Sequence, residues 1–111
     1  MVQTAPLVRM AELEIDPAQL DAYRTLLAEE IEASVASEPG VLALSAVAAK
    51  DDPARLTILE IYADQAAYEA HLRTPHFRKY KALTAEMVRS LRLVEMTPVA
   101  LRAKSGALDW P

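Results

Sequence analysis

The sequence predicts an α+β domain of the ferredoxin-like class, a four-stranded antiparallel sheet with helices on one face. Its elements follow the order β-α-β-β-α-β, which is the split βαβ arrangement. Pro39 and Gly40 end one helical pattern, and Pro75 interrupts another. A further observation is the uncharged segment 41–49, whose near-continuous apolar character is typical of a strand covered on both faces.

The first strand and the first helix are predicted from alternation and from a helix-start signal. Residues 7–15 alternate roughly between apolar and polar side chains. Asp16 suits the N-cap and Pro17 the first helical position, where its missing N–H costs nothing. Apolar residues then recur at helical spacing, and they are Leu20, Tyr23, Leu27, Ile31 and Val35.

Three glutamates of this helix, at positions 29, 30 and 32, fall mostly on its other faces. The helix is predicted to end at residues 38–40. A β-hairpin follows, because two apolar runs, 41–49 and 55–63, flank the short turn 50–54, which contains Asp and Pro.

The second helical region is predicted to break at a proline. Asp64 is a good N-cap for the segment 64–73. Pro75 interrupts this segment, since the residue before a proline is disfavoured in helical geometry. A third helical segment is predicted from Pro75 to about Leu91. Its inner stripe contains His76 or Phe77, Tyr80, Leu83 or Thr84, Met87 and Leu91. Residues 92–101 are predicted as the last strand, with Pro98 indicating an edge position or a bulge.

The chain length of 111 residues fits one domain. We assign a polar arm to residues 1–6, the core to about 7–97, and a tail without periodicity to 102–111. The absence of cysteine excludes disulfides and thiolate chemistry. No signal-peptide pattern is visible, and no apolar run approaches the roughly 18 residues of a transmembrane helix. We therefore expect a cytoplasmic protein that spans no membrane.

The charge pattern argues against a nucleic-acid partner. The chain has 12 basic and 16 acidic residues, for a net charge of -4. Nucleic-acid binding calls for clustered lysine and arginine. The densest basic cluster, formed by Arg78, Lys79 and Lys81, has helical spacing and apolar neighbours. It is interpreted as a solvated helix face.

The apolar second strand predicts a homodimer. A strand with one face in water would alternate, whereas segment 41–49 does not. Helices cover one face of the predicted sheet, and a chain of this length has little left for the other. The same sheet from a second copy would cover it in an isologous dimer.

The third predicted strand carries a candidate site. Glu60 and Tyr62 lie two residues apart and therefore point to the same face, which they share with Ile58. A carboxylate among apolar neighbours is costly unless it is paired or hydrogen-bonded. Glu60 is therefore either a structural ion-pair partner or a pocket carboxylate with a raised pKa.

Both histidines of the chain, His71 and His76, follow within the next helical segments. Each by itself suits a helix cap or a satisfied core position. Together with Glu60 and Tyr62 they could line one cavity between sheet and helices. Two histidines and one carboxylate also have the composition of a non-haem iron triad, but their spacing matches no metal motif, so we expect no metal.

Other chemistries find less support. None of the serines lies in a nucleophile-elbow context. Gly40 and Gly106 are the only glycines, which argues against a glycine-rich phosphate loop. Proton transfer on a small organic substrate remains, because it needs only a histidine or carboxylate near its working pKa and donors for a developing oxyanion.

The segment LEIYADQAAYEAHLRTPHFRKYK, residues 59–81, resembles the antibiotic biosynthesis monooxygenase superfamily of dimeric α+β barrel proteins. The matching features are Glu60 with an aromatic residue at position 62, the N-cap Asp64, His71, and the Thr-Pro-His-aromatic run at 74–77. Residues 16–44 resemble the first helix and second strand of this superfamily. The likeness covers about 7–97 and is greatest to its quinol monooxygenase branch.

This resemblance implies a ferredoxin-like homodimer and a cofactor-independent oxygenase. A small phenol, hydroquinone or anthrone would be deprotonated in an apolar pocket, and its anion would react with O2. His71 would be the base, and His76 and Glu60 would orient the base or the substrate. The substrate-binding residues would be Ile58, Tyr62, Phe77, Tyr80 and Met87.

Two alternatives stay open. The same Glu-aromatic and His-x-x-Thr-Pro-His pattern also resembles an isomerase that acts on a small phosphorylated carbonyl compound related to autoinducer processing. A basic rim of Arg73, Arg78 and Lys79 near the pocket would favour that substrate. A packed interior without a cavity would instead favour a non-catalytic dimer that binds a small molecule.

Overall fold

The computed structural model describes residues 5–106, 108 and 110. The first four residues of the predicted polar arm lie outside this range. The elements along the chain are β1 (Leu7–Ile15), a 3-10 turn (Pro17–Gln19), α1 (Leu20–Ser37), β2 (Val41–Ala49), β3 (Asp52–Tyr62), α2 (Gln65–Leu72), α3 (Pro75–Thr84) and β4 (Val88–Met96).

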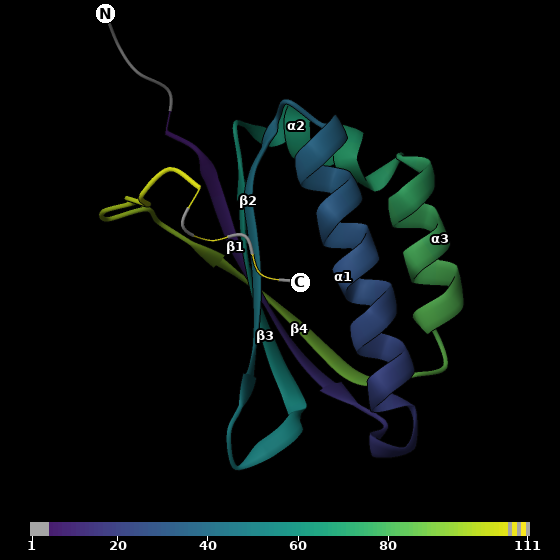
Figure 1. The fold of residues 1–111 in the computed structure, drawn as a ribbon. Helices are drawn as coiled ribbons and strands as arrows, with labels where there is room; N and C mark the ends of the chain where they lie inside the picture. Colours follow the sequence, from purple (N-terminus) through teal and green to yellow (C-terminus); the bar gives the residue numbers. More distant parts are fainter. Residues whose placement is uncertain (1–4, 107, 109, 111) are drawn as a thin grey trace, which may run out of the picture.

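The four strands form one antiparallel sheet in the order β2-β3-β1-β4. Figure 1 shows α1 and α3 side by side on one face of this sheet, with α2 at one end. The predicted ferredoxin-like α+β class is therefore confirmed.

Local sequence signals position most element ends. The Asp16 carboxylate accepts a hydrogen bond from Ala18 N at 3.1 Å, and the Asp64 carboxylate accepts one from Ala67 N at 2.8 Å. Both aspartates thus cap the helical segments that follow them, as predicted. α1 ends at Ser37, immediately before the predicted stop.

The hairpin turn is shorter than predicted. β3 begins at Asp52, so the strand includes Pro53, which the sequence pattern placed in the turn. Pro53 is tolerated because the register between β2 and β3 shifts here, from Ala48 opposite Leu56 to Ala49 opposite Asp52. A proline cannot donate to a sheet ladder, and a bulge is one of the few strand positions that does not need its donor.

The prediction that the third helical segment continues to about Leu91 is wrong. α3 ends at Thr84, and β4 already begins at Val88. Met87 N donates to Thr84 O, and Met87 O accepts from Asp16 N, each at 2.9 Å. The chain then pairs with β1, so long-range strand pairing overrides the local helical spacing. The last strand ends at Met96, which leaves Pro98 beyond it.

The hydrophobic core lies between the helices and the covered face of the sheet. Its buried members come from β1, β3, α1 and α3, and they are Ala11, Leu13, Ile15, Tyr23, Leu27, Leu56, Ile58 and Tyr80. Beneath the helices, the buried hydroxyls of Tyr23 and Tyr80 share a hydrogen bond of 2.6 Å. This bond satisfies two polar groups that burial would otherwise penalise.

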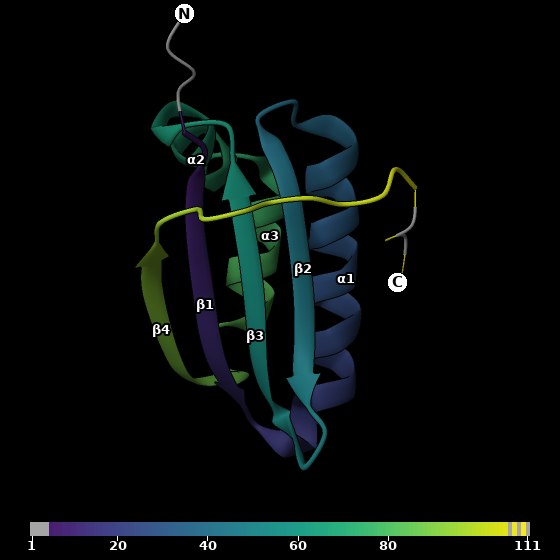
Figure 2. The ribbon, with the colours of Figure 1, turned by 90° about the vertical axis from the view of Figure 1, so that its left-hand side faces the viewer.

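The opposite face of the sheet has no helix over it. Figure 2 shows the segment after β4 crossing in front of β1, β3 and β2 on this face. Apolar side chains remain exposed, including Val47 at 65% and Met96 at 41%. Trp110 in the tail is 93% exposed, and nothing in the structure explains it.

Within the described residues, the helices are all too short or too polar to serve as a membrane span.

Candidate active site

A cavity of about 430 Å³ lies between the covered face of the sheet and the helices. Its walls are mainly apolar and include Leu13, Leu27, Ile31, Ile58, Phe77 and Leu93. Several polar side chains also line it, namely Glu30, Glu60, Tyr62, His71 and Tyr80. A mostly apolar cavity with a few convergent polar groups is the usual form of a small-molecule site.

The third strand directs Ile58, Glu60 and Tyr62 toward the helices, as their two-residue spacing predicted. The Tyr62 hydroxyl donates a hydrogen bond of 2.6 Å to Glu60 Oε1. Burial raises the pKa of Glu60, although this hydrogen bond and the nearby His71 and Arg9 oppose the rise. The Glu60 carboxyl therefore keeps a proton more readily than an exposed glutamate.

Helix α1 contributes a polar stripe that the sequence analysis missed. Glu30, Ser34 and Glu38 follow one another at four-residue spacing, so they share one helix face. Ser34 Oγ donates to Glu30 Oε1 at 2.7 Å, and both residues are buried. Val35, predicted on the inner stripe, is instead 49% exposed.

The prediction that Glu30 falls on an outer face is thus wrong for a geometric reason. Positions 23, 27, 30 and 34 form a helical stripe as regular as the purely apolar one. The packing of α2 and α3 decides which of the two stripes is buried, because these helices bring both histidines to this end of α1. The spacing Glu-x3-Ser-x3-Glu opposite two histidines was the signal that could have revealed the stripe.

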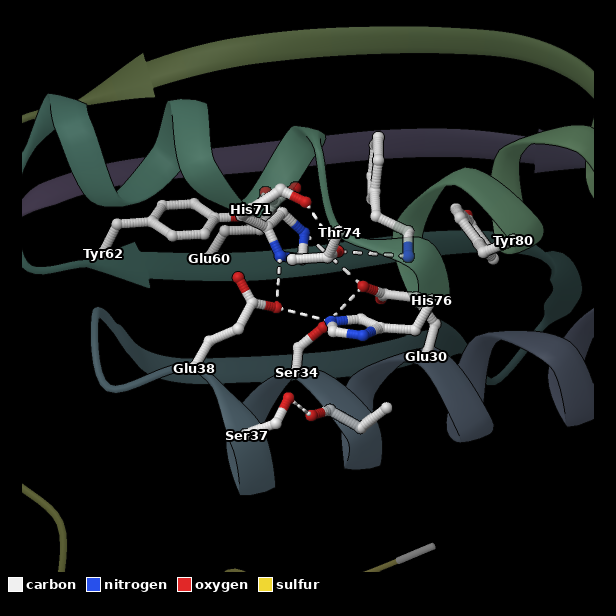
Figure 3. A network of polar contacts seen from close by, with 12 residues as sticks. Glu30, Ser34, Ser37, Glu38, Glu60, Tyr62, His71, Thr74, His76 and Tyr80 are labelled. Carbon is white, nitrogen blue, oxygen red and sulfur yellow. Dashed lines mark hydrogen bonds and ion pairs between the residues drawn. The ribbon is translucent and has the colours of Figure 1, made fainter.

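His71 lies at the centre of the polar network in Figure 3. It belongs to the last turn of α2 and is 3% exposed. Its Nδ1 lies 3.0 Å from Glu38 Oε2, and its Nε2 lies 3.5 Å from Glu30 Oε1. The ring is also packed against Phe77 and Tyr62, with centroids 4.9 and 5.4 Å away. Both ring nitrogens of this buried histidine therefore face carboxylates from α1.

Glu38 joins the two histidines. Its Oε2 also lies 2.6 Å from His76 Nε2. Burial opposes ionisation of Glu38, but the hydrogen bonds from His76 and His71 outweigh it and hold the pKa of this carboxyl below its ordinary value. An ionised Glu38 accepts N–H bonds, so it favours the His71 tautomer with hydrogen on Nδ1 and a lone pair on Nε2.

The Thr74-Pro75 break positions the histidines. Thr74 Oγ1 donates to His71 O at 2.8 Å and accepts from Phe77 N at 3.3 Å. One side chain thus ends α2 and caps α3.

Gly40 brings the loop before β2 against α2. A Cβ at this position would approach Ala67 Cβ to 2.5 Å, which no side chain could occupy without a shift. The close approach keeps α2 beside the end of α1, where Glu38 lies.

The predicted site residues lie in three places. Glu60, Tyr62, His71, Ile58, Phe77 and Tyr80 line the main cavity. His76 lines a second hollow of about 160 Å³ formed by residues of α1 and α3. Met87 packs against the hydrophobic core.

The polar surroundings differ from the predicted ones in two respects. The carboxylates that approach the histidines are Glu30 and Glu38, whereas the sequence pattern suggested Glu60. The basic residues lining the main cavity, within the described ranges, are Lys81 and Arg89. Arg89 is paired with Asp16 at 3.2 Å.

Comparison with known proteins agrees with the resemblance seen in the sequence. The family model described as "Antibiotic biosynthesis monooxygenase" matches residues 6–83. A solved structure of a candidate antibiotic biosynthesis monooxygenase from Bacteroides thetaiotaomicron is 51% identical, with a TM-score of 0.88 over 90% of this chain and 97% of that one. Among curated proteins, none matches the chain.

Two further solved structures are 28% identical. One is a candidate monooxygenase from Lactobacillus acidophilus, with a TM-score of 0.83, and the match covers 86% of this chain but 46% of that one. The other is described as an antibiotic biosynthesis monooxygenase, with a TM-score of 0.77 and coverage of 85% and 99%. The family model and the 51% identical structure both cover most of this chain, and the chain therefore belongs to the antibiotic biosynthesis monooxygenase family.

Proposed function

We propose that the protein is a cofactor-independent monooxygenase that oxidises a small phenol, hydroquinone or anthrone with O2. The observation that carries this proposal is His71, a buried histidine that lines an apolar cavity and whose Nδ1 faces the Glu38 carboxylate at 3.0 Å. The names of the similar structures agree with a monooxygenase.

In the proposed reaction, His71 Nε2 accepts the acidic proton of the substrate. The resulting imidazolium lies between Glu38 and Glu30, and both carboxylates stabilise its charge. The substrate anion then reacts with O2. One oxygen atom stays in the oxidised product, and the other leaves as water with two hydrogens from the substrate.

Glu60 is proposed to stabilise the developing oxyanion, and Tyr62 is proposed to position the Glu60 carboxyl group. A carboxyl group with a raised pKa can donate a hydrogen bond when it is protonated, and the Tyr62 hydroxyl holds this carboxyl in place by donating to its Oε1. Burial beside Glu60 raises the pKa of Tyr62, so its hydroxyl keeps its hydrogen. Phe77, Tyr80 and Ile58 would hold the aromatic ring of the substrate.

The test is oxygen uptake by the purified protein with a panel of hydroquinones and anthrones, in the presence of a chelator. Loss of a general base lowers a rate by about 100- to 10,000-fold, and we expect a loss in this range for His71→Ala. His76→Ala is the matched control, because His76 reaches the network from outside the main cavity, and we expect a smaller loss. Equal rates for wild type and His71→Ala would refute the role of His71.

A second candidate function is proton transfer without oxygen, an isomerisation of a small anionic carbonyl compound. Lys81 and Arg89 on the cavity wall favour it, since they could bind a phosphate or carboxylate. The same base would serve this reaction. Hydrogen exchange of an α-keto substrate in D2O, under anaerobic conditions, would distinguish it from oxygenation.

We also propose that the protein acts as a homodimer, with the open faces of two sheets packed together. Exposed Val47 and Met96 on this face, and the edge position of apolar β2, support the proposal. Light scattering should then give twice the mass of the chain.

A further inference from the structure

We propose that Glu30, His71 and His76 form a binding site for a divalent transition-metal ion such as Zn²⁺ or Co²⁺. Each residue offers one ligand atom, and these atoms lie within 4.8 Å of one another. The ligands come from three different helices, so the site depends on the packing of α1 against α2 and α3. A metal site goes beyond the cofactor-independent reaction proposed above.

The ligand types and distances suit such an ion. Imidazole nitrogen and carboxylate oxygen are common ligands of zinc, at about 2.0–2.2 Å from the metal, which places neighbouring ligand atoms about 3.0–3.6 Å apart. His71 Nε2 and Glu30 Oε1 are already 3.5 Å apart. His76 has to move closer, and its side chain is the most accessible of the three at 21% exposure.

Neighbouring side chains orient the proposed ligands through hydrogen bonds. Ser34 Oγ donates to Glu30 Oε1 at 2.7 Å and fixes the carboxylate. Glu38 accepts the N–H of His71 Nδ1, which leaves the Nε2 lone pair directed to Glu30. A metal-bound histidine usually donates its other N–H to a carboxylate in this way.

The ion can reach the site without passing through the main cavity. The second hollow is lined by Glu30 and His76, and the exposed Glu29 stands beside them. This hollow would give the ion access from the helix side, where the exposed Glu29 and Lys79 carry opposite charges. Because three protein ligands leave coordination positions free, water would complete the shell.

Binding has a consequence for activity, which rests on the proposed function. The metal would occupy His71 Nε2, the lone pair that the proposed base uses. Zn²⁺ should therefore inhibit oxygen uptake, and a chelator should restore it.

The binding experiment uses the full chain after chelator treatment, titrated with Zn²⁺ by calorimetry and with Co²⁺ by visible absorption. We expect one ion per chain. Loss of an outer-shell partner lowers metal affinity about 10- to 100-fold, so loss of a ligand in Glu30→Gln or His76→Ala should lower it at least 10-fold. Glu32→Gln is the matched control, because Glu32 is exposed on the same helix and lines neither hollow, and its affinity should equal that of wild type.

Absence of saturable binding in the wild type would overturn the proposal. Equal affinities of wild type, Glu30→Gln and His76→Ala would overturn it as well, because the ion would then be elsewhere. Circular dichroism of each variant shows whether a loss of affinity reflects unfolding. His76→Ala is expected to remain folded, since His76 is only partly buried.

Oxygen uptake separates this proposal from the proposed function. Binding without any uptake by the metal-free protein would support the site and count against the oxygenase. Oxygen uptake that Zn²⁺ does not change, by a protein that retains no ion, would support the oxygenase and overturn the metal site. An increase in uptake on adding the metal would support the site and overturn the cofactor-independent reaction.

Discussion

The two faces of the sheet differ in which side chains depart from the usual distribution of polar and apolar groups. On the helix-covered face, ionisable groups such as Glu60 and His71 are buried beside a cavity. On the open face, apolar groups such as Val47 and Met96 are exposed. The covered face also buries apolar core residues such as Ile15, in the ordinary way.

Buried polar groups and exposed apolar groups both cost free energy in an isolated chain, so each face indicates an interaction that the chain by itself does not complete. The covered face has a ready-made cavity for a small molecule. The open face offers an apolar surface that a second sheet would bury. One four-stranded sheet thus carries the candidate ligand site on one face and the proposed subunit interface on the other.

The largest expected effect concerns the open face. Val47→Asp places a charge on the surface that the proposed dimer buries, and we expect it to convert the dimer to a monomer. Light scattering measures the mass. Val35→Asp is the matched control, since Val35 is also exposed but lies on α1, and it should leave the dimer intact. A monomeric wild type would contradict the proposed dimer.

The next effect concerns the apolar core of the covered face. Ile15→Ala should lower the free energy of unfolding by about 2–5 kcal/mol, because the side chain is fully buried and its removal leaves a cavity. Denaturant unfolding measures the change. Val99→Ala, at a position 96% exposed, should stay within about 0.5 kcal/mol of wild type. If Ile15→Ala lowered the free energy of unfolding by no more than this, the surrounding core would have to close over the removed side chain.

A smaller effect concerns Glu38, whose pKa lies below the ordinary value of 4.5 in the folded protein. Its ionised form contributes stability above pH 4.5, and this contribution is lost as the pH falls through the folded value. Glu38→Gln should therefore be less stable than wild type near neutral pH, by about 1–3 kcal/mol. The deficit should shrink in acid.

Urea unfolding across this pH range tests the Glu38 prediction. Exposed Glu29 serves as the control, and Glu29→Gln should match wild type at each pH. A deficit for Glu38→Gln that stays constant in acid would show that lost packing, and not lost charge, causes it.

The smallest effect has the opposite sign. Burial raises the pKa of Glu60, so the folded state holds its proton more tightly than the unfolded state. Its contribution to stability is present below pH 4.5 and is lost as the pH rises through the folded value. Glu60→Gln cannot ionise and keeps an acceptor for Tyr62, so it should be more stable than wild type at neutral pH, on the order of 1 kcal/mol.

Thermal unfolding at two pH values measures this change. A gain for Glu60→Gln at neutral pH that disappears below pH 4.5 would show that the covered face gives up stability to keep a carboxyl group. A loss at neutral pH would instead mean that Glu60 is held as a stabilising ion.

The sequence by itself determined the features that depend on neighbours along the chain. The caps at Asp16 and Asp64 act within three residues, so residue type and spacing predict them. The common face of Glu60 and Tyr62 follows from the two-residue repeat of any strand. These local signals also gave the element order, and with it the fold class.

Only the tertiary structure decided which features the elements bring together. Val88 continues a helical pattern locally, but pairing with Ile15 makes it a strand residue. Glu30 matches an exposed helix position locally, but the approach of α2 buries it beside His71. Glu38 contacts His71 and His76, which follow it in the chain by 33 and 38 positions. Such contacts are decided by the packing of whole elements, whose free energy no local spacing contains.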